Sequence, residues 1–297
     1  MLPNFLVIGA GKSGTSSIYE HLADHPQVYM SPVKEPNFFA WDAQQPGRLV
    51  WGSAPDREYA VTDLAAYEGL FAGVRDEIAI GEASTVYLEA AAVPDRVVET
   101  LESPRFIVSL RNPVDRAYSG HWMAVRHGWD HPPYEEAFLP HQDLIEAGRY
   151  PRLLRRWFLR FPPDRFHVIL FEDLKTRPAA TIRSIYEFLG VDAGFRPAAK
   201  VKHNRGGVPR NRLWDDVLSG KGLRPFVAPW LPARARRLVR RFRSRNLAPV
   251  PSMPADLRRR LVEFYRDDIL DLETLIHRDL RAWLRTEGET SRAGGGG

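Results

Sequence analysis

The stretch Phe5–Ser17, FLVIGAGKSGTSS, decides the fold. It joins a short apolar, β-branched run to a glycine-rich segment, and a helical pattern with Ile18 and Leu22 follows it up to Pro26. A second short apolar run over residues 27–30 comes next. This order predicts strand, loop, helix and strand, which is the βαβ unit of a parallel sheet.

The glycine-rich segment Gly9–Ser17 has the composition of an anion-binding loop. Backbone N–H groups at the start of a helix, together with the positive end of the helix dipole, attract phosphate or sulfate groups. Lys12 adds a positive charge, and the hydroxyls of Thr15, Ser16 and Ser17 add hydrogen-bond donors. A glycine turn without a ligand would need none of these polar groups.

Two common nucleotide-binding motifs compete for this loop, and each fails at one point. Its glycines spell G-x-G-x-x-G, but the second strand ends in Ser31-Pro32 rather than in the acidic residue of a dinucleotide site. Gly11-Lys12-Ser13 resembles the end of a Walker A loop, but Leu6 stands where the first glycine belongs. The loop therefore predicts phosphate binding without deciding the nucleotide class.

Strand-like and helix-like stretches alternate along the rest of the chain. Buried strands are expected at 78–80, 105–110 and 166–171, and helices at 62–72, 94–102, 113–127, 148–161, 179–189 and 256–284. The alternation predicts a single P-loop-like α/β domain with a central, mainly parallel sheet flanked by helices on both faces. We expect this domain to span 1–285, with a variable acceptor-site or lid segment at 213–255 and a disordered tail at 286–297.

Composition narrows the class of protein. The 297 residues carry a net charge of +5, which suits an anionic ligand, and 44% hydrophobic residues are typical of a globular domain. The absence of cysteine excludes disulfides, iron–sulfur clusters and thiol nucleophiles. No apolar run approaches the ~20 residues of a membrane span, and no signal peptide is visible, so we expect a cytoplasmic protein.

A second polar cluster follows the cleanest buried strand, RFIVSL. Arg111 lies at the carboxyl end of this strand, where ligands bind in open parallel sheets, and Pro113 suits the first turn of the next helix. Ser119 lies about two turns further, on the helical face of Asn112. An arginine fork and a hydroxyl placed in this way can hold a second phosphate group.

Together these elements resemble the sulfotransferases that use 3'-phosphoadenosine 5'-phosphosulfate (PAPS), in particular the heparan-sulfate-type enzymes and their bacterial relatives. The loop Gly11-Lys12-Ser13-Gly14-Thr15-Ser16-Ser17 is similar to their 5'-phosphosulfate loop, and Arg111-Asn112-Pro113 with Ser119 to their 3'-phosphate element. Four further segments are similar to family elements: the K-E-x-x-F-F segment at Lys34–Phe39, the next strand end at Gly81–Ser84, the late loop over the nucleotide at His203–Arg210 with Arg205, Gly206 and Gly207, and a C-terminal segment at Arg278–Leu284.

The resemblance implies a reaction and roles for its residues. The sulfuryl group would pass from PAPS to a hydroxyl or amine of a small-molecule, glycan or lipid acceptor, leaving 3',5'-adenosine bisphosphate (PAP). Glu35 would be the general base, with Glu82 and His121 as alternatives. Lys12 is the candidate to hold the bridging oxygen as charge develops on the leaving phosphate.

Two positions depart from the heparan-sulfate-type pattern. Ala83 stands where those enzymes often carry a lysine, and Thr85 stands where a proline is usual. The departures leave the donor site untouched but put a polysaccharide acceptor in doubt. Acceptor identity and oligomeric state therefore stay open.

We expect no metal at this site, because no acidic strand end analogous to a Walker B motif is present. His21 with His25, and His127 with His131, have spacings that metal sites also use, but cap, surface or loop roles suit them better. The pair Trp157-Phe158 has core spacing, so packing is expected, with adenine stacking as the alternative.

The segment 234–245 holds seven arginines and no acidic residue. It predicts a solvated face, a lid over an acceptor site for an anionic substrate, or a helix on a membrane surface. Nucleic acid is not expected as a partner, because no recognised module surrounds the segment. For the whole chain, two other functions stay open: a nucleotide-dependent kinase of P-loop type, and a non-catalytic protein that binds a nucleotide or an anionic lipid.

Overall fold

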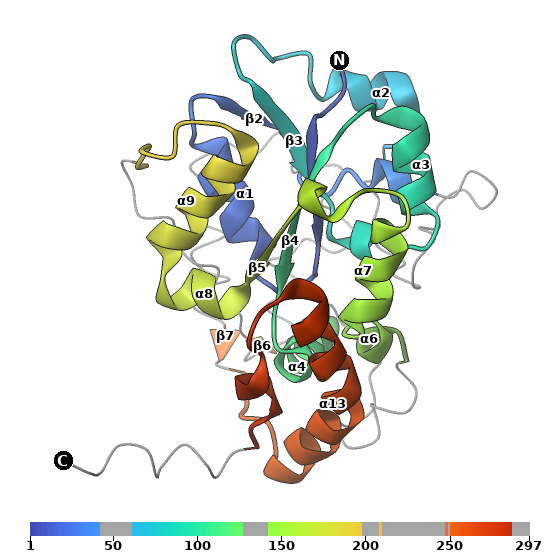
Figure 1. The fold of residues 1–297 in the computed structure, drawn as a ribbon, viewed down its shortest axis with the longest axis vertical. Coiled ribbons are helices and arrows are strands. Elements are labelled where there is room, and N and C mark those ends of the chain that lie inside the picture. Colours follow the sequence, from blue (N-terminus) through green and yellow to red (C-terminus); the bar gives the residue numbers. More distant parts are fainter. Residues whose placement is uncertain (42–60, 127–141, 198–207, 210–246, 249, 287–297) are drawn as a thin grey trace.

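A five-stranded parallel sheet forms the centre of the molecule, in a computed structural model that describes residues 1–41, 61–126, 142–197, 208–209, 247–248 and 250–286 (Figure 1). The strand order is β2-β3-β1-β4-β5. The strands are β1 (Phe5–Gly9), β2 (Val28–Met30), β3 (Ala79–Ala83), β4 (Arg105–Leu110) and β5 (Phe166–Leu170). The predicted α/β class with a mainly parallel sheet is confirmed.

Helices cover both faces of this sheet, as Figure 1 shows. One face carries α1 (Thr15–Ala23), α8 (Phe171–Thr176) and α9 (Pro178–Leu189). The other carries α2 (Leu64–Gly69), α3 (Val93–Thr100) and α7 (Tyr150–Phe158). Beyond the carboxyl ends of the strands lie α4 (Pro113–Arg126), α6 (Gln142–Glu146) and α13 (Ala255–Ile276).

Short elements complete the described chain. The 3-10 turns are η1 (Phe38–Ala40), η2 (Thr85–Leu88), η3 (Pro163–Arg165) and η5 (Arg281–Leu284). A two-residue antiparallel ladder joins β6 (Val208–Pro209) to β7 (Leu247–Ala248).

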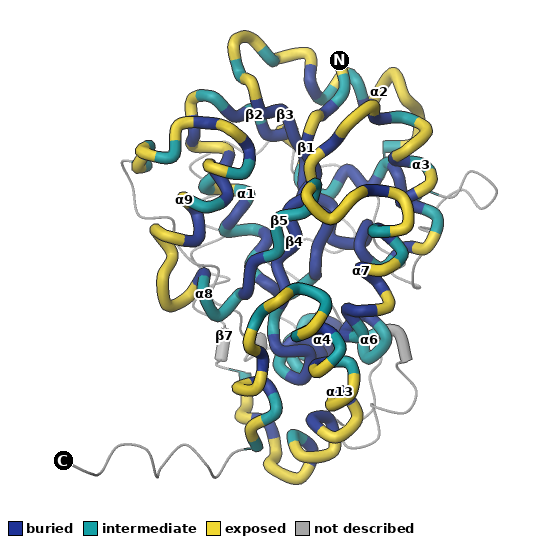
Figure 2. Tube along the Cα trace, in the orientation of Figure 1, coloured by how far each residue is buried: buried dark blue, intermediate teal, exposed yellow. Residues whose placement is uncertain are grey.

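The alternation of side chains along β1 divides the core into two layers. Leu6 and Ile8 belong to the cluster that includes α3, α7 and α13, whereas Phe5 and Val7 belong to the cluster that includes α1 and α9. Every residue of β1 is buried (Figure 2). A strand covered on both faces needs apolar residues at every position, which is why its sequence was recognisable.

Trp157 packs in the core, as its spacing predicted. Its side chain is fully buried, and its ring contacts the rings of Phe106, Phe161 and Phe166. This burial leaves no free face of Trp157 for an adenine base.

The predicted helix 256–284 is wrong at its C-terminal end. Helix α13 ends at Ile276, because His277 adopts a left-handed conformation with φ 52°, and this terminates a helix. The chain then turns, with Leu280 N donating a hydrogen bond to Glu273 Oε2 at 2.8 Å. The apolar pattern continues past the turn because Leu280 and Trp283 are also buried.

Several predicted features lie outside the described residues. They include Arg205, Gly206 and Gly207 of the late loop, the arginine-rich segment 234–245, most of the proposed lid 213–255 and the tail beyond Thr286. The division of the chain at residue 285 stays a prediction, as does the cytoplasmic location. Across the part of the chain that is described, no helix is long and apolar enough to cross a membrane.

The contact between β3 and β1 yields a prediction about Gly81. A Cβ atom at this position would overlap the ring of Phe5, which is fully buried and cannot move aside. We expect Gly81→Ala to lower the free energy of unfolding by about 1–3 kcal/mol. Gly69→Ala in α2 is the control: nothing lies within 4 Å of its added Cβ, so stability should rise by about 0.5–1 kcal/mol. Urea unfolding measures both, and equal stabilities would contradict this packing.

Candidate active site

The glycine-rich loop connects β1 to α1 at the carboxyl ends of the strands. At Gly14 the backbone is left-handed, with φ 88°. A Cβ there would lie 2.9 Å from Phe171 Cδ2 and 3.0 Å from Leu174 Cδ2, both on α8. Glycine adopts this conformation at low cost and lets α8 approach the loop closely.

Three hydrogen bonds tie this loop to the end of β4. Ala10 N donates to Ser109 O at 2.7 Å, and Ser109 Oγ donates to Ser13 O at 2.5 Å. Arg111 Nη1 donates to Lys12 O at 3.2 Å. The predicted 5'-phosphosulfate loop and the predicted 3'-phosphate arginine therefore form one connected unit.

Phe171 is a site residue that the sequence analysis missed. It was assigned to the strand, but it begins α8, where its ring lies against Gly14 and 5.0 Å from the Arg111 guanidinium carbon. A cation over an aromatic face is attracted to it, so the ring helps to orient Arg111. Its position at a strand end was the available signal.

Two hydroxyls of the loop region are buried without a hydrogen-bond partner among the described residues. They are Ser13 Oγ and Ser17 Oγ. An unsatisfied buried hydroxyl costs about 1–3 kcal/mol, so native proteins rarely retain one without a functional reason. Together with the start of α1, they form a donor set that fits an anionic phosphate or sulfate group.

Left-handed backbone is concentrated at this site. Four non-glycine residues have positive φ in the described part of the chain, and three of them are Lys12 at 71°, Glu35 at 59° and Asn37 at 55°. Such a conformation costs of order 1–3 kcal/mol per residue, and it persists where surrounding contacts enforce it. The strain therefore marks the glycine-rich loop and the Lys34–Phe39 loop as candidate functional segments.

The Lys34–Phe39 loop brings Glu35 next to α1. Lys34 Nζ donates to Ser16 Oγ at 2.8 Å and lies 3.5 Å from Glu35 Oε1. Thr85 Oγ1 donates to the same carboxylate oxygen at 3.4 Å. The Glu35 side chain keeps 25% exposure, so two donors orient it while it remains reachable. Thr85, noted in the sequence only as a departure, thus contacts the proposed base.

The two alternative bases have closed environments. Glu82 is fully buried in β3, and burial raises its pKa to about 7, although hydrogen bonds from Tyr87, Ser84 and Tyr67 act to lower it. His121 on α4 keeps only 4% exposure, and its ring lies edge-on to that of Trp122. A base that takes a proton from an acceptor must reach it, and this requirement favours Glu35.

Helix α4 contacts both the glycine-rich loop and a segment far away in the sequence. Ser119 is half-buried on this helix. From the loop, Lys12 Nζ reaches to 3.6 Å from Met123 Sδ. The backbone of β6, at the end of the predicted late loop, also lies against α4. The helix that carries Ser119 therefore meets both elements expected around the nucleotide.

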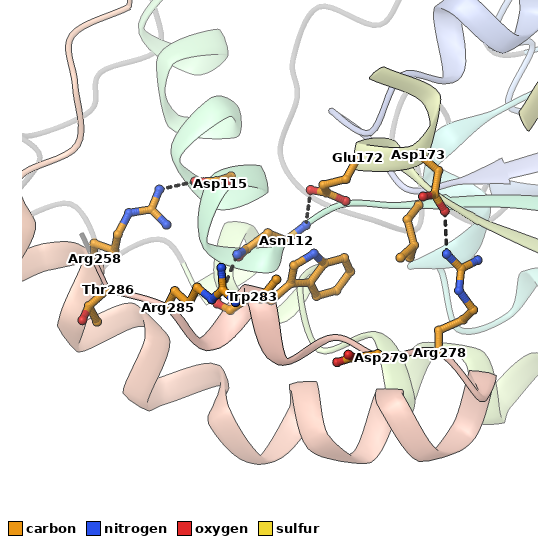
Figure 3. Close-up of a pocket in the computed structure, with 12 residues that line it drawn as sticks. Asn112, Asp115, Glu172, Asp173, Arg258, Arg278, Asp279, Trp283, Arg285 and Thr286 are labelled. Carbon is orange, nitrogen blue, oxygen red and sulfur yellow. Dashed lines mark hydrogen bonds and ion pairs between the residues drawn. The ribbon is translucent and has the colours of Figure 1, made fainter. Parts of the chain in front are cut away.

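Asn112 lines a cavity of about 540 Å³ (Figure 3). Asn112 Oδ1 accepts from Val114 N and caps α4, while Asn112 Nδ2 donates to Trp283 O at 3.2 Å. The ion pairs Arg258–Asp115 and Arg278–Asp173 also line the cavity, and among the described residues of the two predicted phosphate-binding elements Asn112 alone does so. It lies where the C-terminal segment packs onto the strand ends.

Comparison with known proteins shows the family of this chain. The protein-family model described as "Sulfotransferase family" matches residues 3–195 of the chain. The chain belongs to the sulfotransferase family. A solved sulfotransferase from Alicyclobacillus acidocaldarius is 30% identical in sequence to this chain. The two structures match with a TM-score of 0.72, over 96% of this chain and 100% of that chain.

Curated relatives of this sulfotransferase include two kinds of heparan sulfate enzyme. The human bifunctional heparan sulfate N-deacetylase/N-sulfotransferase 2 is 28% identical over 99% of this chain and 32% of that protein. The mouse heparan sulfate glucosamine 3-O-sulfotransferase 3A1 is 27% identical over 64% of this chain and 46% of that protein. The chain thus spans about a third of the length of the first relative.

The environment of Glu82 makes stability depend on pH. Because its pKa is raised from 4.5 to about 7, the folded state holds a proton there that the unfolded chain releases. This contribution is fully present below pH 4.5 and is lost as the pH rises through 7. The groups that face Glu82 are Tyr67, Ser84, Tyr87 and Glu35.

We therefore expect a fall of up to about 3 kcal/mol in the free energy of unfolding across this window from Glu82 alone. Glu82→Gln cannot titrate and should lack this component. Urea unfolding of both proteins at pH 5 and pH 8 measures it. The same pH dependence in the two proteins would show that Glu82 does not titrate here.

Proposed function

We propose that this chain transfers the sulfuryl group of PAPS to a hydroxyl or amine of a small-molecule, glycan or lipid acceptor. The observation that carries the proposal is the connection of the anion-binding loop to Arg111 on one side and to Glu35 on the other. Membership of the sulfotransferase family supports the class of reaction. The names of the curated relatives support an acceptor that includes a sugar amine or hydroxyl.

The residues at the site fit the two anionic ends of this donor. The buried hydroxyls of Ser13 and Ser17 can donate hydrogen bonds to a 5'-phosphosulfate, and the positive end of α1 attracts its charge. Arg111 and Ser119 suit the 3'-phosphate, for which a guanidinium provides paired N–H donors. Arg205, Gly206 and Gly207 are proposed to close over the nucleotide.

The reaction needs a base and a stabilised leaving group. PAPS supplies a sulfuryl group attached to a phosphate that can leave. Glu35 takes the proton from the acceptor hydroxyl or amine, and the Lys34 ammonium with the Thr85 hydroxyl keeps its carboxylate in place. Lys12 stabilises the negative charge that develops on the bridging oxygen.

A panel of acceptors with ³⁵S-labelled PAPS tests the proposal as a whole. The panel should contain an N-unsubstituted glucosamine polysaccharide, its N-acetylated form, a hydroxylated lipid and simple phenols. Labelled product with one acceptor class supports sulfuryl transfer and identifies the acceptor. Absence of transfer to every class, in a protein that binds PAP, favours a non-catalytic nucleotide-binding function.

The donor site predicts discrimination between two nucleotides. PAP should raise the melting temperature, because a ligand that binds only the folded state stabilises that state. At a hundredfold excess over Kd, the free energy of unfolding rises by about 2.7 kcal/mol. AMP lacks the 3'-phosphate and should have a much smaller effect. Ser119→Ala should reduce the PAP shift and leave the AMP shift unchanged. Differential scanning fluorimetry measures these shifts, and equal shifts by PAP and AMP would rule out this 3'-phosphate site.

The proposed base predicts a separation of binding from turnover. Glu35→Gln keeps the shape of the side chain and removes the proton acceptor, so turnover should fall by roughly 10²–10⁴. Donor affinity, measured by calorimetry, should stay near that of the wild type. Lys12→Ala is the contrasting variant and should lower both donor affinity and turnover, because the charge of Lys12 contacts the donor before and during the reaction. Near wild-type turnover in a folded, PAP-binding Glu35→Gln variant would exclude Glu35 as base.

Metal dependence separates the proposed transfer from a kinase reaction. Sulfuryl transfer at this site should survive EDTA, because Lys12 and the start of α1 supply the positive charge. A P-loop kinase would lose its activity with EDTA and regain it with magnesium. Transfer assays with and without chelator decide between the two, and a magnesium requirement would favour the kinase.

A further inference from the structure

Glu82 is a buried carboxylate that the proposed chemistry does not use. Its Oε1 accepts a hydrogen bond from Tyr67 OH at 3.3 Å, and its Oε2 accepts one from Ser84 Oγ at 2.8 Å. Tyr87 also forms a hydrogen bond with it. Three hydroxyl groups therefore converge on one carboxylate, and both tyrosine side chains are fully buried.

The loop that carries Glu35 packs against the residues that follow Glu82. Three alternate backbone N–H groups of this loop donate to residues that follow Glu82. The bonds are Glu35 N to Ala83 O at 2.9 Å, Asn37 N to Ser84 Oγ at 3.1 Å and Phe39 N to Tyr87 OH at 3.3 Å. Two of these acceptors are hydroxyls that also contact Glu82.

The direction of these hydroxyl protons follows from their hydrogen-bond partners. A hydroxyl carries a single proton, and the oxygens of Ser84 and Tyr87 accept from loop N–H groups. Each must therefore donate its own proton elsewhere, and Glu82, which is ionised above its pKa of about 7, then offers only acceptors. Ser84 and Tyr87 also form a hydrogen bond with each other, and the carboxylate is the acceptor that both share, so it orients the two hydroxyls as the loop needs.

We propose that Glu82 is a positioning residue for the transfer reaction. It orients the hydroxyls of Ser84 and Tyr87 so that they hold the Lys34–Phe39 backbone, and Glu35 with it, in the reactive conformation. The proposal rests on the proposed role of Glu35 as base. These hydrogen bonds also explain how the left-handed backbone at Glu35 and Asn37, where φ is 59° and 55°, is maintained.

Replacement of Glu82 by glutamine keeps the size of the side chain but changes its hydrogen bonding. In the orientation that keeps the hydrogen bond from Tyr67 to the side-chain oxygen, the amide NH₂ takes the place of Oε2 and donates to Ser84 Oγ or Tyr87 OH. That hydroxyl then has to turn its proton away from the glutamine. The loop N–H of Asn37 or Phe39 loses a well-oriented acceptor as a result. The loop should loosen although the residue never contacts it directly.

Hydrogen exchange of the loop amides tests this anchor without an acceptor substrate. In mass-spectrometric exchange, Glu82→Gln and Tyr87→Phe should speed exchange in the peptide 34–40 about tenfold, an expected loss of about 1.4 kcal/mol of local protection. Tyr67→Phe is the matched control. It also removes one hydrogen bond to Glu82 and keeps the ring stacked on Phe38 at 4.2 Å, but no loop N–H donates to Tyr67 among the described residues. Its loop exchange should stay within about twofold of the wild type.

Kinetics with an acceptor test the link to Glu35. Glu82→Gln should lower kcat about tenfold and leave the donor KM and the PAP-induced melting shift unchanged. If Glu82 acts through Glu35, the double variant Glu35→Gln/Glu82→Gln should be no slower than Glu35→Gln alone.

Two outcomes would overturn the positioning role. One is unchanged loop exchange in Glu82→Gln, and the other is a multiplicative loss of kcat in the double variant. If PAP does not stabilise the wild type, the proposed function fails, whereas the exchange experiment still decides whether Glu82 anchors the loop.

Discussion

The hydrogen bonds between the end of β4 and the glycine-rich loop are the contacts on which the site depends. The loop has no regular secondary structure, so its backbone groups need partners elsewhere, and Ser109 supplies both a carbonyl and a hydroxyl. Arg111, two residues further, donates to the carbonyl of Lys12. Because the same strand end fixes the loop and presents the arginine, the two elements proposed to bind phosphate keep a constant separation. A donor with phosphates at both ends requires such a constraint.

Two neighbouring carboxylates illustrate how environment divides roles. Glu35 keeps a quarter of its surface and lies beside a lysine, whereas Glu82 is enclosed by hydroxyls and has its pKa raised by burial and by the charge of Glu35. An exposed carboxylate can exchange protons with an acceptor. A buried one can hold neighbouring groups in place, and here those groups hold the loop of its exposed neighbour. Ionisation of Glu82 costs stability, which is consistent with a functional reason for keeping it.

The sequence was sufficient for the features that are continuous along the chain. The buried run at Phe5–Ile8 and the adjoining polar loop define a βαβ unit, and Arg111 follows a second buried run. Features that depend on distant partners could not be read in the same way. The role proposed for Thr85 depends on its contact with Glu35. The role proposed for Glu82 depends on its hydrogen bonds with hydroxyls from α2 and η2. The break at His277 depends on one backbone conformation that the apolar pattern does not encode.

The most direct test of this account is a crystal structure of the protein with PAP. The account predicts the 5'-phosphate on the N–H groups and hydroxyls at the start of α1, with the 3'-phosphate within hydrogen-bond distance of the Arg111 guanidinium and Ser119 Oγ. Glu35 should lie on the 5' side, facing the space from which an acceptor approaches. A nucleotide bound in the cavity that Asn112 and Trp283 line, or a 3'-phosphate directed away from Arg111, would contradict it.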